Sequence, residues 1–226
     1  MSNSADIWAV VPVKDTRMAK RRLGDALSDE LRRRLALAML EDVLLALAAS
    51  PGLAGIAVVT LDSSASTLAS RFGARILVNG ARDGITGAVT AAAEVLGAEG
   101  HTAVLAIPGD VPLITPREVG AILAAHVRQP DFVIVPSHDG RGSNAILCAP
   151  PGCVALKYGD DSFLLHLQAA RRAEIEPRVL RLPGIALDID HPRDLAAFLQ
   201  IESATRTRAL LDEVAAPGRA WRAAAI

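Results

Sequence analysis

The chain has 226 residues, of which 51% are apolar, and its 24 lysines and arginines nearly balance its 25 aspartates and glutamates. Such a chain can bury one substantial core without disulfides or a structural metal. The near-neutral charge and the aromatic content of only 3% argue against partners such as nucleic acid or an anionic membrane. No uninterrupted apolar segment approaches the roughly 20 residues of a membrane span. With two cysteines read as reduced thiols, we expect a cytoplasmic protein.

Short β-branched runs alternate along the chain with longer segments rich in alanine and leucine. The runs predict strands at 7–13, 55–60, 74–78, 102–107, 131–136, 144–148 and 178–182. Helical spacing predicts one long helix capped by Ser28 and ended by Pro51, then helices at 64–72, 85–96, 116–127, 162–172 and 191–213. Because such alternation is typical of βαβ units, it predicts an α/β fold with a mostly parallel sheet.

After about residue 136 the alternation loosens, which suggests an antiparallel addition that forms a second wall of a cleft. We expect residues 1–200 to form the catalytic domain. Residues 201–226 are expected to hold the end of the last helix and a mobile tail, which is also a possible contact in a homodimer.

A cluster of cations directly follows the first predicted strand, in the stretch VPVKDTRMAKRRL (Lys14, Arg17, Lys20, Arg21, Arg22). In an open α/β sheet, ligands bind beyond the carboxyl ends of the strands, so this position favours phosphate binding. A solvated basic turn is the alternative. The glycine-rich sequences of a P-loop and of a dinucleotide site are absent.

Asp110 follows the predicted strand 102–107 and lies between two prolines, in IPGDVPLI. A carboxylate at the end of a buried strand is costly unless it is paired, and a hard cation such as Mg²⁺ would stabilise it. The alternative is a turn carboxylate before the next helix, although Thr115 already suits the cap of that helix.

Two further acids, Asp188 and Asp190, lie two residues apart in LDIDHPRDL. We expect only one of them to reach the site. Asp190 could instead cap the last helix, with Pro192 in its first turn.

Two polar loops late in the chain contain glycine: one precedes Ser143 and Asn144, and the other holds Gly159 and Ser162. Ser162 could cap the helix that follows, whose N-terminus would suit an anion. Simple turns explain either loop alone, but both together favour an acidic or phosphorylated acceptor. The histidines lack metal-ligand spacing, which disfavours zinc.

These motifs together resemble a known family. VPVKDTRMAKRRL, IPGDVPLI, RGSNAILCAPP, YGDDSF and LDIDHPRDL, in this order over residues 7–200, resemble the 2-phospho-L-lactate guanylyltransferases of coenzyme F420 biosynthesis. That family includes the phosphoenolpyruvate and 3-phospho-D-glycerate guanylyltransferases. The resemblance implies a three-layer Rossmann-like nucleotidyltransferase fold with helices on both faces of a mixed sheet. It also implies GTP as donor, Mg²⁺ as cofactor and transfer of GMP to a phosphorylated three-carbon acid, with loss of pyrophosphate.

The resemblance also implies roles for individual residues. The triphosphate would meet Lys14, Lys20 and Arg22, and the metal would be held by Asp110 and Asp190. The remaining contacts would come from Gly84, Thr86 and Gly109 for the nucleotide, and from Ser143, Asn144, Gly159 and Ser162 for the acceptor. One departure is Gly84-Ile85-Thr86, where family members commonly have Gly-Leu-Asn.

Two other functions stay open at this point. The first is a related nucleotidyltransferase that acts on a sugar phosphate or on a molybdenum-cofactor precursor. The second is a catalytically silent nucleotide-binding domain, which would bind GTP without needing Mg²⁺ and would turn over no acceptor.

Overall fold

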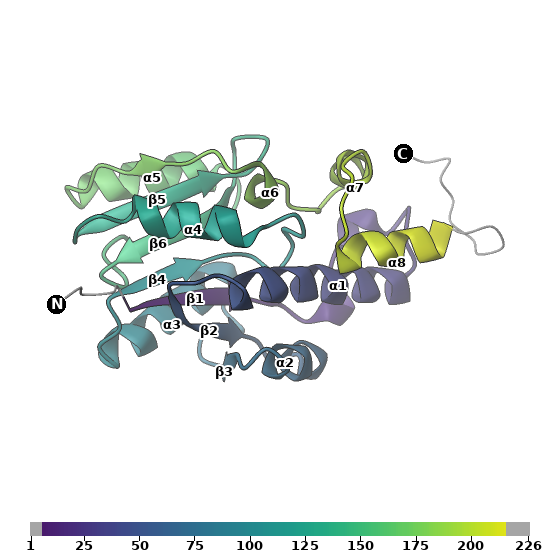
Figure 1. Ribbon diagram of the computed structural model, residues 1–226, viewed down its shortest axis with the longest axis horizontal. Coiled ribbons are helices and arrows are strands. Elements are labelled where there is room, and N and C mark those ends of the chain that lie inside the picture. Colours follow the sequence, from purple (N-terminus) through teal and green to yellow (C-terminus); the bar gives the residue numbers. More distant parts are fainter. Residues whose placement is uncertain (1–5, 216–226) are drawn as a thin grey trace.

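The computed structural model describes residues 6–215 as one seven-stranded sheet with helices on both faces (Figure 1). The strand order is β3-β2-β1-β4-β6-β5-β7. The strands are β1 (Ile7–Pro12), β2 (Leu53–Val59), β3 (Arg75–Leu77), β4 (Ala103–Ala106), β5 (Asp131–Pro136), β6 (Ser143–Ala149) and β7 (Arg178–Val179). The predicted α/β class and the mostly parallel mixed sheet are therefore confirmed.

The direction of the strands decides which residues meet at one edge of the sheet. β1 pairs in parallel with β2 and β4, so the loops after these strands leave at the same edge. β6 runs antiparallel to both β4 and β5, as the loosened alternation after residue 136 predicted. The start of β6 therefore lies at the edge where β1 and β4 end.

The helices form two layers over the sheet. They are α1 (Asp29–Ala48), α2 (Ser63–Ser70), α3 (Gly84–Ala98), α4 (Pro116–Ala125), α5 (Ser162–Arg172), α6 (Pro183–Ala186), α7 (Pro192–Leu199) and α8 (Arg206–Ala215). Alternate residues of β1 point to opposite layers. Ala9 and Val11 pack in a cluster with α1, α2 and α4, whereas Val10 packs with α3 and α5. Because β1 is buried on both faces, the polar side chains of this part of the chain begin only after the end of the strand.

A third hydrophobic cluster lies beyond the sheet, where α7 and α8 pack against α1 (Figure 1). The single last helix predicted over 191–213 was wrong, because residues 200–205 separate α7 from α8. The buried Asp42 of α1 accepts hydrogen bonds from the backbone N–H groups of Arg206 and Thr207 at 2.7 and 2.9 Å. The described part of segment 201–226 is thus packed on α1, and the predicted mobile tail at 216–226 lies outside the described residues.

Two of the helix starts follow the predicted capping. The Ser28 side chain accepts from Leu31 N–H, and Thr115 forms a capping box with Glu118. Ser162 does not cap α5, because it is the first helical residue and follows Asp161, which has left-handed backbone angles. None of the helices within residues 6–215 combines the length and the apolar character needed to span a bilayer.

Candidate functional site

A pocket of about 370 Å³ opens at the edge of the sheet where β1 and β4 end. Its polar lining comes from three separate parts of the chain. The loop after β1 contributes Lys14 and Lys20, the loop after β4 contributes Gly109 and Asp110, and the segment before α7 contributes Asp190. Lys14, Lys20, Asp110 and Asp190 thus share one cavity, whereas Arg22, which was also expected at the triphosphate, is not part of its lining.

The loop after β1 is built from two short 3-10 turns, η1 (Thr16–Met18) and η2 (Arg21–Leu23). Thr16 is buried and donates to one carboxylate oxygen of Asp62, from its backbone N–H at 2.9 Å and from its hydroxyl at 2.6 Å. Asp62 also caps α2 by accepting from Ala65 N–H. This contact ties the cationic loop to the neighbouring β2–α2 connection.

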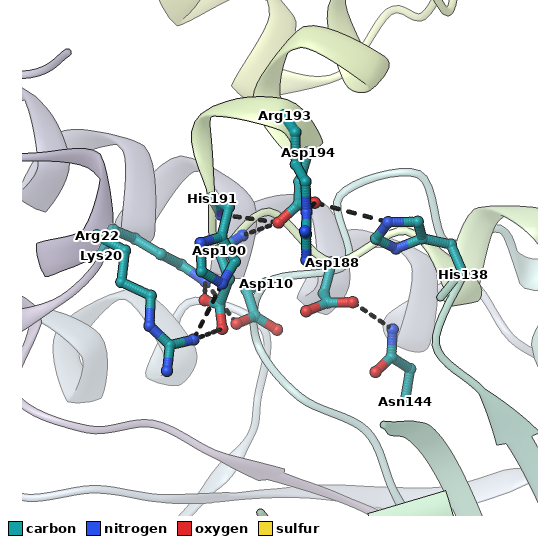
Figure 2. A network of polar contacts seen from close by, with 10 residues as sticks. All are labelled: Lys20, Arg22, Asp110, His138, Asn144, Asp188, Asp190, His191, Arg193 and Asp194. Carbon is teal, nitrogen blue, oxygen red and sulfur yellow. Dashed lines mark hydrogen bonds and ion pairs between the residues drawn. The ribbon is translucent and has the colours of Figure 1, made fainter. Parts of the chain in front are cut away.

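Lys20 lies between the two turns and adopts left-handed backbone angles, with φ of 52°. Its ammonium donates to Asp110 Oδ2 at 2.6 Å and to Asp190 Oδ1 at 2.7 Å (Figure 2). The Lys20 side chain is only 7% exposed. Arg22 lies on the outer side of the same acid, with its guanidinium 3.8 Å from Asp190 Oδ2. Lys14 is exposed and makes no ion pair within residues 6–215.

The segment before α7 is held against the β4 loop by the backbone, since Ile189 N–H donates to Asp110 O at 3.1 Å. Leu187 and Ile189 are buried, and Asp188 and Asp190 lie on the other side of the segment. Of the two acids, Asp190 lines the pocket and Asp188 does not, in agreement with the expectation that only one of them reaches the site. Side chains alternate along an extended segment, so residues two apart share a face. Figure 2 shows Asp188 and Asp190 beside Asp110.

Asp194, in the first turn of α7, fixes the end of this segment. One of its carboxylate oxygens accepts from the backbone N–H groups of Asp190 at 3.1 Å and His191 at 2.7 Å. His191 is the N-cap position of α7 and Pro192 its first residue. Asp190 therefore does not cap the helix, and its side chain is left to pair with Lys20.

Asn144, at the start of β6, holds the segment that carries Asp188 and Asp190 in place by hydrogen bonds. Its amide nitrogen donates to the carbonyl oxygens of Ile185 and Ala186, at 3.1 and 2.9 Å, and to Asp188 Oδ1 at 2.9 Å. Asn144 is buried. Its position next to the acids explains how the start of β6 joins the site.

None of the four residues expected at the acceptor lines the pocket, and three of them (Ser143, Gly159 and Ser162) belong to segments next to the buried His166. Ser143 Oγ is 3.0 Å from His166 Nδ1, and His166 Nε2 accepts from Lys157 N–H at 3.0 Å. Because Nε2 accepts, Nδ1 carries the proton and donates to Ser143. Gly159 and the buried Ser162 belong to the loop that follows Lys157, where Ser162 N–H donates to Gly159 O.

The residues expected at the nucleotide are divided between two places. Gly109 lines the pocket, and a side chain there would press against Leu40 and the end of β1. Gly84 begins α3 with φ of 71°, which favours glycine. Thr86 accepts a hydrogen bond from Tyr158 N–H at 3.0 Å, and the adjacent Ile85 lines the pocket. α3 thus links the pocket to the Lys157–Ser162 loop.

The charges in the pocket shift one another's pKa values. Burial alone would lower the pKa of Lys20, but the charges and hydrogen bonds of Asp110 and Asp190 raise it instead. Burial opposes ionisation of Asp190, yet Lys20 and Arg22 hold its pKa below the usual value. The pKa of Asp188 is raised by burial and then by the negative charges of Asp110 and Asp190. The acids therefore repel one another, and Lys20 offsets the repulsion.

The acids suit a hard divalent cation in type and only partly in number. Asp110 and Asp190 are oxygen donors of the kind that Mg²⁺ prefers, and each has a second oxygen that Lys20 does not contact. Within residues 6–215, however, no three histidine, cysteine, aspartate or glutamate side chains form a complete metal cage. A metal here would need further ligands from a bound substrate.

Comparison with known proteins decides the family. The family model described as "Guanylyl transferase CofC like" matches residues 7–218. The chain belongs to this CofC-like guanylyltransferase family. It is 40% identical to the phosphoenolpyruvate guanylyltransferase of Rubrobacter xylanophilus, over 84% of this chain and 92% of the relative. It is 33% identical to the 3-phospho-D-glycerate guanylyltransferase of Colwellia psychrerythraea, over 86% of this chain and 91% of the relative.

Solved structures agree with the family at the level of the fold. A protein from Desulfovibrio desulfuricans named as a nucleotide-diphospho-sugar transferase superposes with a TM-score of 0.72 at 20% identity, covering 92% of this chain and 95% of its own. A 4-diphosphocytidyl-2C-methyl-D-erythritol synthase superposes with a TM-score of 0.60 at 14% identity, covering 92% and 100%. The predicted nucleotidyltransferase fold is confirmed, and family membership makes this chain a nucleotidyltransferase.

Several residues of the site were not found from the sequence. Asp188 was named from the sequence, but its position beside Asp110 was not expected, although Asp-x-Asp in an extended segment places both acids on one face. Asp194 also had a local signal, since it is the third residue of a helix that begins with Pro192. Asp62 and His166 had none, because their partners Thr16 and Ser143 lie 46 and 23 residues away.

Proposed function

We propose that this protein transfers GMP from GTP to a phosphorylated three-carbon acid, with release of pyrophosphate, in the biosynthesis of coenzyme F420. The acceptor would be phosphoenolpyruvate, 3-phospho-D-glycerate or 2-phospho-L-lactate. The observation that carries the proposal is the pocket in which Lys14 and Lys20 lie beside Asp110 and Asp190. The names of the relatives support guanylyl transfer to acids of this class.

The reaction needs little covalent work from the protein. A phosphate oxygen of the acceptor forms a bond to the α-phosphorus of GTP while the bond to the bridging oxygen of the β-phosphate breaks. The acceptor oxygen is already an anion, so no general base is needed. The main task is to bring two anions together, and holding them in line lowers the barrier by pre-paid entropy of about 7 kcal/mol or more.

The roles of the residues follow from their positions. Lys14 is exposed at the pocket and without an ion pair in the described chain, so it can meet the triphosphate first. Asp110 and Asp190 would hold Mg²⁺ together with phosphate oxygens, and the metal would supply charge neutralisation at the phosphates. The residues expected at the acceptor (Ser143, Asn144, Gly159 and Ser162) lie outside the lining of this pocket, so their contact with the acceptor stays a prediction.

An acceptor panel tests the proposal. The protein is incubated with GTP, Mg²⁺ and each of the three acids, with a sugar phosphate as a fourth acceptor, and the products are identified by mass. We expect a guanosine diphosphate ester of one three-carbon acid and stoichiometric pyrophosphate. Asp110→Asn should lower the rate at least about 100-fold, whereas Glu202→Gln, at an exposed acid outside the pocket, should not. Transfer only to the sugar phosphate, or full activity of Asp110→Asn, would contradict the proposal.

A further inference from the structure

The Lys20 ammonium lies between Asp110 and Asp190. It neutralises carboxylate charge that a metal ion would otherwise neutralise. Its ammonium is 2.6 Å from Asp110 Oδ2 and 2.7 Å from Asp190 Oδ1, so both are short, charge-assisted hydrogen bonds. The side chain is 7% exposed, and the acids are more open to solvent than the lysine that joins them. Figure 2 shows the three side chains converging from the η1–η2 loop, the β4 loop and the segment before α7.

The contact between these groups is built into the fold. The left-handed backbone of Lys20 is uncommon for a residue other than glycine, and it directs the side chain inward between η1 and η2. Asp110 and the acidic segment are locked together by the Ile189–Asp110 backbone hydrogen bond. Asp194 fixes Asp190 from the other side. Backbone conformation fixes the position of Lys20, and hydrogen bonds to backbone groups fix the positions of Asp110 and Asp190.

The chemistry makes lysine and metal competitors. An ammonium and a divalent cation seek the same carboxylate oxygens, and an oxygen that accepts a short hydrogen bond from Lys20 has its charge already neutralised. Removal of the ammonium would leave Asp110 and Asp190 beside Asp188 in a partly buried place, with only partial compensation from Arg22, 3.8 Å from Asp190 Oδ2. Carboxylates that are only partly compensated in such a place are costly, so they would bind a cation more strongly.

We propose that Lys20 acts as a built-in cation of the site. Without nucleotide, its ammonium bridges Asp110 and Asp190. When a triphosphate binds, the Lys20 ammonium pairs with the phosphate oxygens instead and leaves the oxygens of Asp110 and Asp190 to a divalent cation. Divalent cation and nucleotide then bind as a pair, and the cation alone binds poorly. The part that involves triphosphate rests on the proposed function. The competition between Lys20 and the cation rests on the geometry of the bridge alone.

Binding of Mn²⁺ in the absence of nucleotide tests the competition. Free Mn²⁺ is measured by electron paramagnetic resonance with the wild-type protein, with Lys20→Met and with Lys157→Met. The last variant is a matched control, because Lys157 is exposed and is not part of the pocket lining. We expect Lys20→Met to bind one Mn²⁺ about tenfold or more tighter than the other two proteins. Its melting temperature should fall without metal and rise when Mn²⁺ or Mg²⁺ is added, as linkage requires.

Equal Mn²⁺ affinity of Lys20→Met and the wild type would overturn the proposal. Should Lys20→Met fail to fold, the wild type alone decides. Water-proton relaxation, which distinguishes protein-bound Mn²⁺-GTP from free Mn²⁺-GTP, should show tight binding of Mn²⁺ only with GTP. Tight binding of Mn²⁺ without GTP would overturn it. No acceptor is present in these measurements, so a negative result leaves guanylyl transfer standing, and an inactive acceptor panel leaves the competition standing.

Discussion

Asp62 holds Thr16 through a single carboxylate oxygen, which accepts both the backbone N–H and the hydroxyl of Thr16. The other oxygen accepts Ala65 N–H and caps α2. Together these bonds hold the pKa of Asp62 below its usual value, although burial acts to raise it. One side chain thus joins the start of α2 to the loop that carries Lys14 and Lys20.

Because Asp62 makes two kinds of contact, substitutions can separate its contact with Thr16 (the anchor) from its capping of α2. Asp62→Asn keeps an acceptor for the α2 cap, but an amide cannot replace both contacts to Thr16. We expect it to raise the KM for GTP several-fold with a small loss of stability. Asp62→Ala removes cap and anchor and should lower the free energy of unfolding by about 1–3 kcal/mol. Urea unfolding and steady-state kinetics measure the two effects, and wild-type GTP kinetics in Asp62→Asn would contradict the anchoring role.

Removing the charge of Lys14 and removing that of Lys20 should have different effects on the free energy of unfolding. Lys14 is exposed, so Lys14→Met should leave the free energy of unfolding within about 0.5 kcal/mol of the wild type. It should nevertheless weaken GTP binding about tenfold or more, because a phosphate contact is lost. Lys20→Met should alter both quantities, since it leaves Asp110 without its ion pair and Asp190 with only the 3.8 Å contact to Arg22. Isothermal calorimetry with GTP and urea unfolding make the comparison, and equal stability losses in the two variants would contradict it.

His166 should make the stability of the protein depend on pH below neutrality. Burial lowers the pKa of His166 to about 4, from a usual value of about 6.5. Between these values the unfolded chain binds the proton and the folded protein does not, so stability falls as pH decreases from about 6.5 toward 4. The loss has an upper limit of about 3 kcal/mol.

The variant His166→Gln isolates this contribution. Glutamine cannot take up a proton, so the difference in unfolding free energy between wild type and variant should shrink as pH falls from 7 to 5. Urea unfolding at several pH values measures it. The reverse trend, with the wild type gaining on the variant at low pH, would show that the folded protein favours a protonated His166.

Asp194 should influence nucleotide binding without touching the nucleotide. Asp194→Ala frees the backbone N–H groups of Asp190 and His191, so the Asp190 carboxylate loses its fixed position. We expect an unfolding free energy lower by about 1–3 kcal/mol and weaker binding of Mg²⁺-GTP. Thr115→Ala removes a comparable cap from α4 and should lower stability by about 1 kcal/mol with unchanged Mg²⁺-GTP binding. A loss of Mg²⁺-GTP affinity in Thr115→Ala equal to that in Asp194→Ala would rule out a specific role for Asp194.

Much of the fold follows from local patterns in the sequence. A short β-branched run predicted strand β5 and helical spacing predicted helix α5, both with the bounds that the structure has, because each depends on neighbours within a few residues. The prediction of a single last helix was wrong, since the break at 200–205 depends on where α8 packs against α1. Asp42, which receives the start of α8, lies 164 residues from Arg206.

The sequence by itself determined the class of the sheet, the cations after β1 and the acid after β4, because strand ends and charge are local properties. Only the tertiary structure decided that Lys20 bridges Asp110 and Asp190, which are 90 and 170 residues away. Those contacts depend on the order in which strands add to the sheet and on single backbone bonds such as that from Ile189 to Asp110. Neither leaves a signature in a short stretch of residues.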